Sequence, residues 1–222
     1  SPLRKWDKAF SKRPDFIIAN STHTKAEIMK YYDRESFVIF PPVELARFKN
    51  TYTKKSGFVV TGRQTPYKKI DLAVKASKEL NERLIVIGNG PDHQKLLEIA
   101  NGNKNITFVT NASDKEVADY LKKAKGFIFA GIDDFGIAPV EALASGTPVI
   151  AFNKGGALDY IKNKENGILF NKQNVETLKE AIKEFNTLSF NQQKVAKTAD
   201  HFSEKQFKDN IIKFIKDCLN KK

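Results

Sequence analysis

The stretch Leu84-Ile85-Val86-Ile87-Gly88-Asn89-Gly90-Pro91 shows the pattern that decides the fold: four apolar residues in a row, ended by a glycine-rich turn. A continuous apolar run of this length is typical of a strand buried on both faces, as in a parallel sheet. Similar runs follow this pattern elsewhere, at residues 57–61, 106–109, 127–130 and 149–152. Their spacing of roughly 20–27 residues is that of βαβ units. The sequence therefore predicts an α/β fold with a Rossmann-like, doubly wound parallel sheet.

Amphipathic segments and helix-capping residues lie between these runs and after them. Leu72, Ala73, Ala76 and Leu80 share one helical face, and Ser113-x-x-Glu116 has the form of a capping box. In the tail, Asn174 and Ser203 are predicted N-caps. The last helix has a wide apolar stripe that must pack on something; the stripe consists of Phe207, Ile211, Phe214, Ile215 and Cys218.

The first 45 residues repeat the strand-helix-strand pattern once, in a separate place. Residues 15–20 and 37–40 are predicted strands, and Thr24-x-x-Glu27 is the predicted cap of the helix between them. One β-α-β unit cannot bury a core of its own, so it must complete another domain or dock on this one. We therefore predict residues 1–45 as a unit of their own, 46–56 as a linker, 57–200 as the Rossmann-like domain and 201–222 as a C-terminal helix.

Composition excludes several classes of protein. The chain has 222 residues, of which 41% are hydrophobic and 29% charged, and these fractions rule out a disordered polar chain. No apolar run approaches the roughly 18–20 residues of a membrane-spanning helix. A single cysteine, Cys218, excludes a disulfide framework, and the three histidines lack the spacing of metal ligands. We expect no metal site.

The formal charge of +12 is unevenly distributed along the chain. Residues 1–55 carry a net +6, residues 56–159 a net +1 and residues 160–222 a net +5. The basic ends can attract phosphates or an anionic membrane surface, or they can form an ordinary solvated, lysine-rich surface. A nucleic-acid reader would concentrate its charge on one recognition element. The distribution therefore disfavours specific nucleic-acid binding.

Two loops that follow predicted strands have the composition of phosphate-binding loops. Gly62 allows a tight turn and a close approach to a ligand, and Arg63 and Lys68 bring positive charge to the start of the next helix. A basic surface loop is the alternative. Gly88 and Gly90 permit a diphosphate to lie against the backbone, but a tight turn explains them equally well. The third glycine of a dinucleotide fingerprint is missing, which disfavours NAD.

The most informative segment follows the predicted strand 127–130: Asp133-Asp134-Phe135-Gly136-Ile137-Ala138-Pro139-Val140-Glu141. Gly136 and the next amides begin a helix near Pro139, where an anion or a hydroxyl group can bind. Glu141 is then expected to point into the same cleft and hold sugar hydroxyls, as an acidic residue holds the ribose in dinucleotide sites. The alternative is a solvated acidic loop with a glutamate on the helix surface.

These motifs together resemble the donor-binding half of glycosyltransferase family 4, retaining enzymes of the GT-B fold. The family pattern E-x-F-G-x-x-x-x-E, then A-x-A-x-G-x-P-V-I, is matched here by D-D-F-G-I-A-P-V-E and A-L-A-S-G-T-P-V-I. G-R-Q-T-P-Y-K-K-I-D and I-G-N-G-P precede it in the family's order. Gly155-Gly156 and E-N-G-I-L-F follow it. The likeness covers residues 15–170, and A-N-S, P-P-V and D-F-G-I-x-P-V-E-A are most similar to bacterial polysaccharide mannosyltransferases.

The resemblance implies a role for each matching residue. Arg63 and Lys68 would bind the nucleotide diphosphate, Glu141 the donor ribose, and Asp133 the transferred sugar; Asp133, Arg63 and Lys68 are the implied catalytic set. Asp133 is shorter than the family's glutamate. Thr110 stands where the family often has glycine, which affects base contacts around Asn111. The remaining implied donor-binding residues are Gly62, Gly88, Gly90, Phe135, Gly136, Ile137 and Ala138.

The resemblance also implies a function and its partners. It suggests a hexose, best mannose from GDP-mannose or another GDP- or UDP-sugar, transferred without a metal to a polysaccharide or lipid-linked acceptor. The expected location is the cytoplasm, with a peripheral place at the inner face of the membrane left open. The resemblance implies that residues 1–45 are the remnant of the family's N-terminal acceptor domain and that the C-terminal helix, residues 201–222, packs back across the domains. We therefore expect this chain to bind a donor but transfer sugar poorly. The rivals are a sugar-nucleotide epimerase of the same architecture and a non-enzymatic phosphate or nucleic-acid binder.

Overall fold

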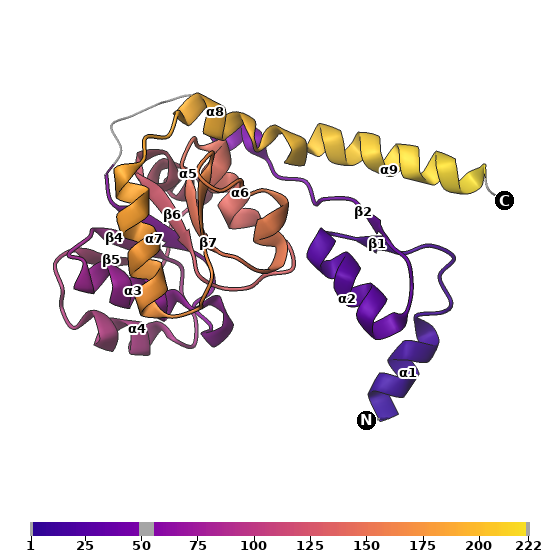
Figure 1. Cartoon of the computed structure of the whole chain (residues 1–222), viewed down its shortest axis with the longest axis horizontal. Helices are drawn as coiled ribbons and strands as arrows, with labels where there is room; N and C mark the ends of the chain where they lie inside the picture. The colour runs from indigo at the N-terminus through magenta and orange to yellow at the C-terminus, as the bar shows by residue number, and fades with distance from the viewer. Residues whose placement is uncertain (1, 49–55, 221–222) are drawn as a thin grey trace.

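The computed structural model describes residues 2–48 and 56–220, and its main body is a parallel sheet of six strands in the order β5-β4-β3-β6-β7-β8 (Figure 1). Every neighbouring pair runs parallel. This is the strand order of a doubly wound nucleotide-binding sheet. The strands are β3 (Phe58–Thr61), β4 (Leu84–Ile87), β5 (Ile106–Val109), β6 (Gly126–Phe129), β7 (Val149–Phe152) and β8 (Gly167–Phe170).

The order of the strands reverses between β3 and β6, which lie side by side at the centre of the sheet. Phe58 pairs with Leu84 of β4 on one side and with Gly126 of β6 on the other. In open α/β sheets the ligand lies outside the carboxyl ends of the strands at such a reversal. The loops that leave β3 and β6 are therefore the place to look for a site.

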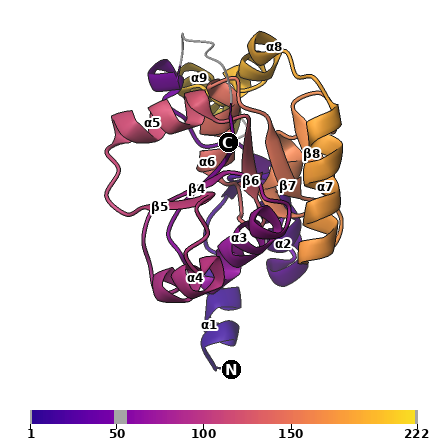
Figure 2. The same cartoon turned by 90° about the vertical axis from the view of Figure 1, so that its left-hand side faces the viewer.

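Helices cover both faces of the sheet (Figure 2). One face packs on α3 (Ile70–Glu79), α4 (His93–Ala100) and α7 (Val175–Thr187). The other packs on α5 (Asp114–Lys123), α6 (Ile137–Ala144), α8 (Gln192–Lys197) and the 3-10 helix η1 (Leu45–Phe48). Because both faces are covered, β6 and β7 are buried along their whole length. Burial on both faces explains why the strands read as continuous apolar runs.

The predicted Rossmann-like sheet and its five strands are confirmed, but the sequence analysis missed the sixth strand, β8. Its segment is short and begins with Gly167. A Cβ at Gly167 would lie 2.1 Å from the carbonyl oxygen of Val149, so the glycine is needed for close pairing with β7. A glycine inside a short apolar run weakens a strand prediction, although here it is what permits the strand.

Three of the four predicted helix caps are confirmed. Ser113 forms the predicted capping box with Glu116, and the side chains of Asn174 and Ser203 accept from backbone amides of α7 and α9 (Glu204–Leu219). The fourth prediction, Thr24-x-x-Glu27, is wrong. Helix α2 (Thr22–Tyr32) begins earlier, because Ser21 is the N-cap and accepts from the amide of Thr24 at 2.9 Å.

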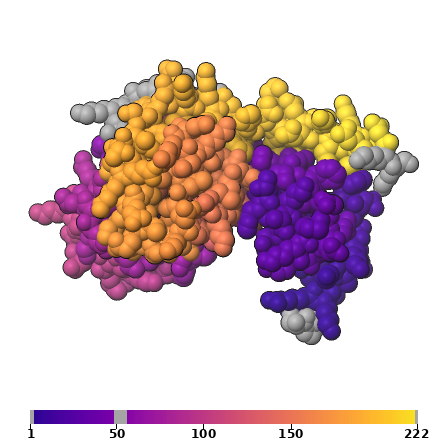
Figure 3. Space-filling model, in the orientation of Figure 1, coloured from indigo at the N-terminus to yellow at the C-terminus, as the bar shows by residue number. Residues whose placement is uncertain are grey.

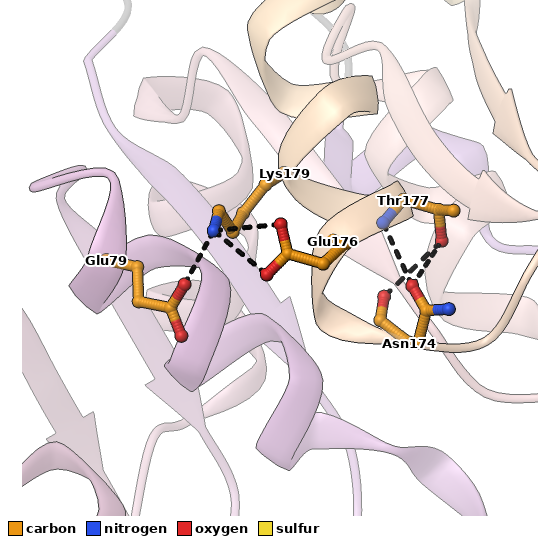
Figure 4. A network of polar contacts seen from close by, with 5 residues as sticks. All are labelled: Glu79, Asn174, Glu176, Thr177 and Lys179. Carbon is orange, nitrogen blue, oxygen red and sulfur yellow. Dashed lines mark hydrogen bonds and ion pairs between the residues drawn. The ribbon is translucent and has the colours of Figure 1, made fainter.

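Helices α3 and α7 are joined at their surface by a polar network (Figure 4). The Lys179 ammonium of α7 lies 2.7 Å from the Glu79 carboxylate of α3 and 3.1 Å from Glu176 of its own helix. At the start of α7, Asn174 caps the amide of Thr177. These contacts fasten two neighbouring helices that cover the same face of the sheet.

The N-terminal segment forms a separate small unit beside the main body (Figure 3). After α1 (Pro2–Phe10), strand β1 (Ile18–Ala19), helix α2 and strand β2 (Phe37–Val38) make the predicted parallel β-α-β unit, with shorter strands than predicted. The Asp159 carboxylate, at the end of 3-10 helix η3 (Gly155–Asp159), accepts from the Thr22 amide at 2.9 Å and from its hydroxyl. One carboxylate thus ties the start of α2 to the main body.

Helix α9 runs from the main body to the N-terminal unit (Figures 1 and 3). The ring of Phe214 lies 4.9 Å from that of Phe37 and 6.0 Å from that of Phe16, between ring centroids. The predicted apolar stripe therefore does pack across, but only in part, since Ile215 is 50% exposed.

The predicted domain boundaries fall inside packed structure. Val43, Leu45 and Phe48 are buried in the core under α5 and α6, and so is Phe202 of the 3-10 helix η4 (Asp200–Phe202). Val43 also donates its amide to the carbonyl of Phe202 at 2.8 Å. The start of the predicted linker is thus part of the main body, and residues 49–55 lie outside the described residues.

In the described part of the chain, every helix is too short or too polar to cross a membrane.

Candidate functional site

A cleft of about 590 Å³ opens at the carboxyl ends of β3 and β6, where the strand order reverses. It lies between the main body and the N-terminal unit, and both contribute to its walls. Its lining residues are Asn20, Pro41, Thr61, Gly62, Tyr67, Lys68, Phe129, Ile132, Asp133, Asp134, Phe135, Gly136, Ile137 and Ala138. Seven of the predicted site residues are in this set, and they come from three different loops and helices.

The loop after β3 brings a bare stretch of backbone and one cation to the cleft. Gly62 has φ +143°, and a Cβ placed there would meet no atom within 4 Å, so its backbone is open. Lys68 ends the 3-10 helix η2 (Pro66–Lys68), and its side chain is 21% exposed. Gly131 lets the loop after β6 come close, because a Cβ there would lie 2.9 Å from the Cα of Lys68. The two loops therefore form one surface.

Asp133 and Lys68 form an ion pair inside the cleft. The Lys68 ammonium donates to Oδ2 of Asp133. The other carboxylate oxygen, Oδ1, is buried and accepts no hydrogen bond from any residue that the structure describes. A buried acceptor without a donor is unfavourable, so a hydroxyl or water that enters the cleft has a ready partner there.

Contacts with Gly156 and Tyr160 hold the backbone around Asp133 in place. The amide of Gly156 donates to the carbonyl of Asp133 at 2.9 Å, and a Cβ on Gly156 would lie 2.4 Å from the Cα of Phe135. The Tyr160 hydroxyl donates to the carbonyl of Phe135 at 2.8 Å. Burial, with smaller contributions from the charges of Asp133 and Asp159, holds the pKa of Tyr160 well above its usual value, so this hydroxyl stays a donor.

Helix α6 points its N-terminus at the cleft. Gly136 precedes it with φ +85°, and a Cβ there would lie 2.8 Å from the Tyr160 hydroxyl. The first amides of a helix have no acceptor within the helix and carry the positive end of its dipole. Gly136, Ile137 and Ala138 all line the cleft. Together with Lys68 they provide a binding place for an anion.

Glu141, predicted to point into the cleft, is paired with a cation at the neighbouring surface of α6. It lies one helical turn beyond Ile137 on α6, and it is not among the described lining residues. Its Oε1 lies 3.1 Å from a terminal nitrogen of Arg47, and its side chain is 16% exposed. Burial raises the pKa of Glu141 above its ordinary value, the charge of Arg47 lowers it, and Asp114 raises it further. The predicted ribose contact stays a prediction.

Gly88 and Gly90 pack loop against loop. A Cβ at Gly88 would lie 2.3 Å from the carbonyl oxygen of Gly62, and one at Gly90 would lie 2.5 Å from that of Gln64. The fully buried Gln64 side chain donates to the Gly88 carbonyl at 2.7 Å and contacts Nδ1 of His93 at 2.8 Å. These contacts support the tight-turn interpretation of the two glycines. The glycines allow their loop to pack closely against the loop that contains Gly62.

The two remaining predicted residues lie beside the cleft. Arg63 follows Gly62, and Asn111 lies in the loop between β5 and α5; both are exposed. Neither is among the described residues that line the cleft. Their implied roles, on the diphosphate and on the base, stay predictions.

Sequence reasoning missed several residues that build the site. Gln64, Gly131 and Tyr160 position loops, and Arg47 reaches Glu141 from a segment predicted as linker. Only Gly131 carried a visible signal, as a glycine directly after an apolar run. The others act over sequence separations that no local pattern reveals.

No group of three or more histidine, cysteine or acidic side chains in the described residues is arranged to hold a metal ion. The expectation of metal-independent chemistry stays a prediction.

The arrangement defines a class of site: a strand-reversal cleft in a doubly wound sheet, with a helix N-terminus, a cation and a carboxylate oxygen that has no hydrogen-bond donor among the described residues. This is the chemistry needed for a phosphorylated, hydroxyl-rich ligand. Residues 43–209 match the family model described as "Glycosyl transferases group 1", which is well over half of the chain. The chain belongs to this family.

Curated relatives agree with this assignment. An uncharacterized glycosyltransferase of Methanocaldococcus jannaschii is 28% identical over 173 residues, 77% of this chain and 49% of the relative. The O-antigen chain mannosyltransferase RfbU of Salmonella typhimurium is 29% identical over 194 residues, 79% of this chain and 55% of the relative. The chain thus spans about half the length of these relatives.

Solved structures share the fold. Sucrose-phosphate synthase from Thermosynechococcus elongatus superimposes with a TM-score of 0.82 at 19% identity, covering 99% of this chain and 62% of that one. Anabaena HepE, in complex with UDP and glucose, gives a TM-score of 0.80 at 16% identity, covering 96% of this chain and 66% of that one.

Proposed function

We propose that this chain binds a nucleotide sugar and supplies the donor side of a retaining glycosyltransferase of family 4. The observation that carries the proposal is the meeting of Lys68, Asp133 and the N-terminus of α6 in one cleft. Lys68 lies far in the sequence from Asp133 and the start of α6. Together the three groups match a sugar diphosphate: a cation and amides for phosphate, an open carboxylate oxygen for a hydroxyl. Membership of the family supports the same function.

The groups have distinct roles in the proposed reaction. As the bond between the anomeric carbon of the sugar and the diphosphate oxygen breaks, positive charge develops on that carbon and negative charge on the departing diphosphate. Lys68 and the amides of Gly136 and Ile137 stabilise the negative charge. Arg63, beside the cleft, contributes further stabilisation of that charge. Asp133 accepts a hydrogen bond from the transferred sugar through Oδ1. No metal ion takes part in this scheme.

The proposed donor is GDP-mannose, and the proposed acceptor is a polysaccharide or lipid-linked glycan. The relatives support this choice: one is the Salmonella O-antigen mannosyltransferase, and another is named as GDP-mannose-dependent. On the other side of the cleft, Asn20 and Pro41 of the N-terminal unit contribute to the wall. The acceptor is expected to approach from that side, because the opposite walls are the ones that carry the phosphate-binding groups.

A thermal-shift panel of UDP-, GDP- and ADP-sugars tests this function. A ligand that binds only the folded chain stabilises it by about 2.7 kcal/mol at one hundred times its dissociation constant. We expect GDP-mannose to raise the melting temperature most, and free mannose to have no effect. A larger shift with UDP- or ADP-sugars would correct the donor. The absence of a shift with every nucleotide and nucleotide sugar, at millimolar concentration, would contradict the proposal.

A further inference from the structure

Arg47 lies at the centre of a cluster of carboxylates next to the proposed nucleotide site. Its two terminal nitrogens lie 3.1 Å from Glu141 of α6 and 2.8 Å from Asp114 of α5. Its Nε lies 3.2 Å from Glu44, without the geometry of a hydrogen bond. One side chain of η1 therefore connects the first turn of α5 to the second turn of α6.

The three partners of Arg47 differ greatly in exposure. The side chains of Asp114 and Glu44 are 86% and 56% exposed, so water screens their attraction and each pair contributes little. Glu141 is 16% exposed. A carboxylate that is mostly removed from water depends on its partner to stay ionised and in place. The contact of Arg47 with Glu141 is therefore the one with consequences.

Glu141 is also the member of this cluster that lies on the same helix as two lining residues of the cleft. Ile137 and Ala138 line the cleft, and residues three and four positions apart share one face of a helix. Glu141 is thus the next side chain along that face, about 5.4 Å further on. A nucleotide can therefore reach Glu141 if its phosphates lie at the start of α6 and its ribose lies along this face of the helix.

Arg47 contacts only one of the two carboxylate oxygens of Glu141. It donates to Oε1, whereas Oε2 receives no hydrogen bond from the residues for which the structure gives contacts. Because Arg47 fixes the position of Oε1, the direction of Oε2 is defined as well. That geometry suits the acceptance of a hydrogen bond from a sugar hydroxyl.

We propose that Arg47 is the positioning residue of the nucleotide site, holding the Glu141 carboxylate ionised and oriented so that Oε2 accepts hydrogen bonds from the ribose of the donor. This inference rests on the function proposed above and adds to it a residue outside the conspicuous motifs. Arg47 acts through Glu141 and does not itself touch the ligand.

Electrostatics gives the proposal a consequence that a purely structural role lacks. The charged groups of the described residues that act on Glu141 are Arg47 and Glu44 near η1 and Asp114 of α5. Burial and the two other carboxylates raise the pKa of Glu141, and Arg47 alone opposes them. Removal of Arg47 therefore raises the pKa of Glu141 further, and removal of Asp114 lowers it. The pH at which ribose recognition is lost must move in opposite directions in the two variants.

The test uses the full 222-residue chain and calorimetric titration between pH 5 and 9. The probes are the nucleoside diphosphate that the parent binds most tightly, among UDP, GDP and ADP, and its 2′,3′-dideoxy form. The variants are Arg47→Met, Arg47→Gln, Arg47→Lys and Asp114→Asn. The measured quantities are the ratio of the two dissociation constants and the pH at the midpoint of its loss.

We expect the parent to prefer the ribose form at least about tenfold near neutral pH, as for a charge-assisted hydrogen bond. Arg47→Met and Arg47→Gln should lose most of this preference at pH 7 and regain it at higher pH. Arg47→Lys, which keeps the charge, should stay close to the parent. Asp114→Asn should move the midpoint to lower pH. If Arg47→Met does not fold, Arg47→Gln decides the question in its place.

Two other outcomes are distinguishable. In the first, the parent prefers the ribose form and Glu141→Gln abolishes the preference, but the Arg47 variants keep it with an unchanged midpoint. Arg47 is then only a structural link, and this inference fails alone. If the parent binds no nucleoside diphosphate, the proposed function fails and this inference fails with it.

Discussion

Two carboxylates eight residues apart, Asp133 and Glu141, are both paired with a cation, yet their surroundings differ. Asp133 has Lys68 as its partner, inside the cleft, and the pair is neutral. Glu141 shares Arg47 with two further carboxylates, and that cluster is negative overall. The comparison shows that the two ends of the site suit different parts of a ligand. A diphosphate is attracted to the end with Lys68 and helix amides and is repelled by the acidic end, whereas neutral hydroxyl groups are accepted at the acidic end.

The orientation of a nucleotide follows from this difference. Its phosphates belong at the start of α6, and its ribose belongs one turn further along the helix. Substitutions at the phosphate end should leave ribose binding intact, and substitutions at the ribose end should leave phosphate binding intact.

The largest effect is expected from Lys68→Ala. Loss of a charge-assisted contact is worth about 1.5–3 kcal/mol, or about ten- to a hundredfold in affinity. We expect a loss of this size for a nucleoside diphosphate and little change for the nucleoside, measured by calorimetric titration. Arg63→Ala, at an exposed position, should have the same selectivity and a smaller effect.

Lys75→Ala is the matched control for Lys68→Ala. Lys75 is also an ion-paired lysine, bound to Asp71 at 3.1 Å on the surface of α3. It does not line the described part of the cleft. Equal losses for nucleoside and diphosphate on Lys68→Ala, or a similar loss on Lys75→Ala, would rule out the assigned phosphate end.

The ribose end is disturbed by Glu141→Gln, which keeps the shape of the side chain and removes its charge. We expect a loss of about tenfold in affinity for ribose nucleotides. The 2′,3′-dideoxy form should already bind weakly to the parent and should not change further. An equal loss for both forms would show that Glu141 does not contact the ribose.

A smaller effect of opposite sign is expected from Asp133→Asn. The asparagine is close in shape but no longer neutralises Lys68 or repels an anion. A partly exposed ion pair is worth about 0–1 kcal/mol, so a nucleoside diphosphate should bind up to about fivefold more tightly. Transfer of sugar by the complete enzyme should fall, because Oδ1 is then part of an uncharged amide. Weaker diphosphate binding would mean that Asp133 does not hold Lys68 away from the ligand.

The smallest effect is on stability as a function of pH. The pKa of Glu141 is raised in the folded chain, mainly by burial, so the folded state holds its proton more tightly than the unfolded state. The stability due to this group is present below the ordinary pKa of a glutamate and is lost as the pH rises through the raised value. Glu141→Gln should therefore gain in melting temperature relative to the parent as the pH rises across this window. A difference between the two that stays constant with pH would contradict the raised pKa.

The sequence predicted the parts of this molecule that rest on local pattern or strong burial. Five of the six strands of the sheet were visible as apolar runs, and all of these but β5 are mostly buried. Ser113, Asn174 and Ser203 were visible because capping is a local interaction. The cleft residues after β3 and β6 were predicted because glycines, cations and carboxylates follow these strands at the start of a helix, and because the segments resemble the family's motifs.

The parts that were missed depend on distant partners. The start of α2 was misplaced because Ser21 is buried and Asp159, far along the chain, accepts from Thr22. Arg47 was missed as the partner of Glu141 because nothing near Glu141 in the sequence reveals it. Gly88 and Gly90 left a ligand site and a tight turn equally open, because the backbone of the loop that they pack against is distant in the sequence.

The central claim is that a nucleoside diphosphate lies along the start of α6, and amide chemical-shift mapping by NMR tests it most directly. Addition of pyrophosphate should shift the amides of Gly62, Gly136 and Ile137, and GDP or UDP should shift these together with the amides around Glu141. A second cavity of about 360 Å³, lined in part by Arg83 and Lys104, lies at the amino ends of the strands and serves as the internal comparison. Shifts confined to that cavity, with the start of α6 unaffected, would contradict the account.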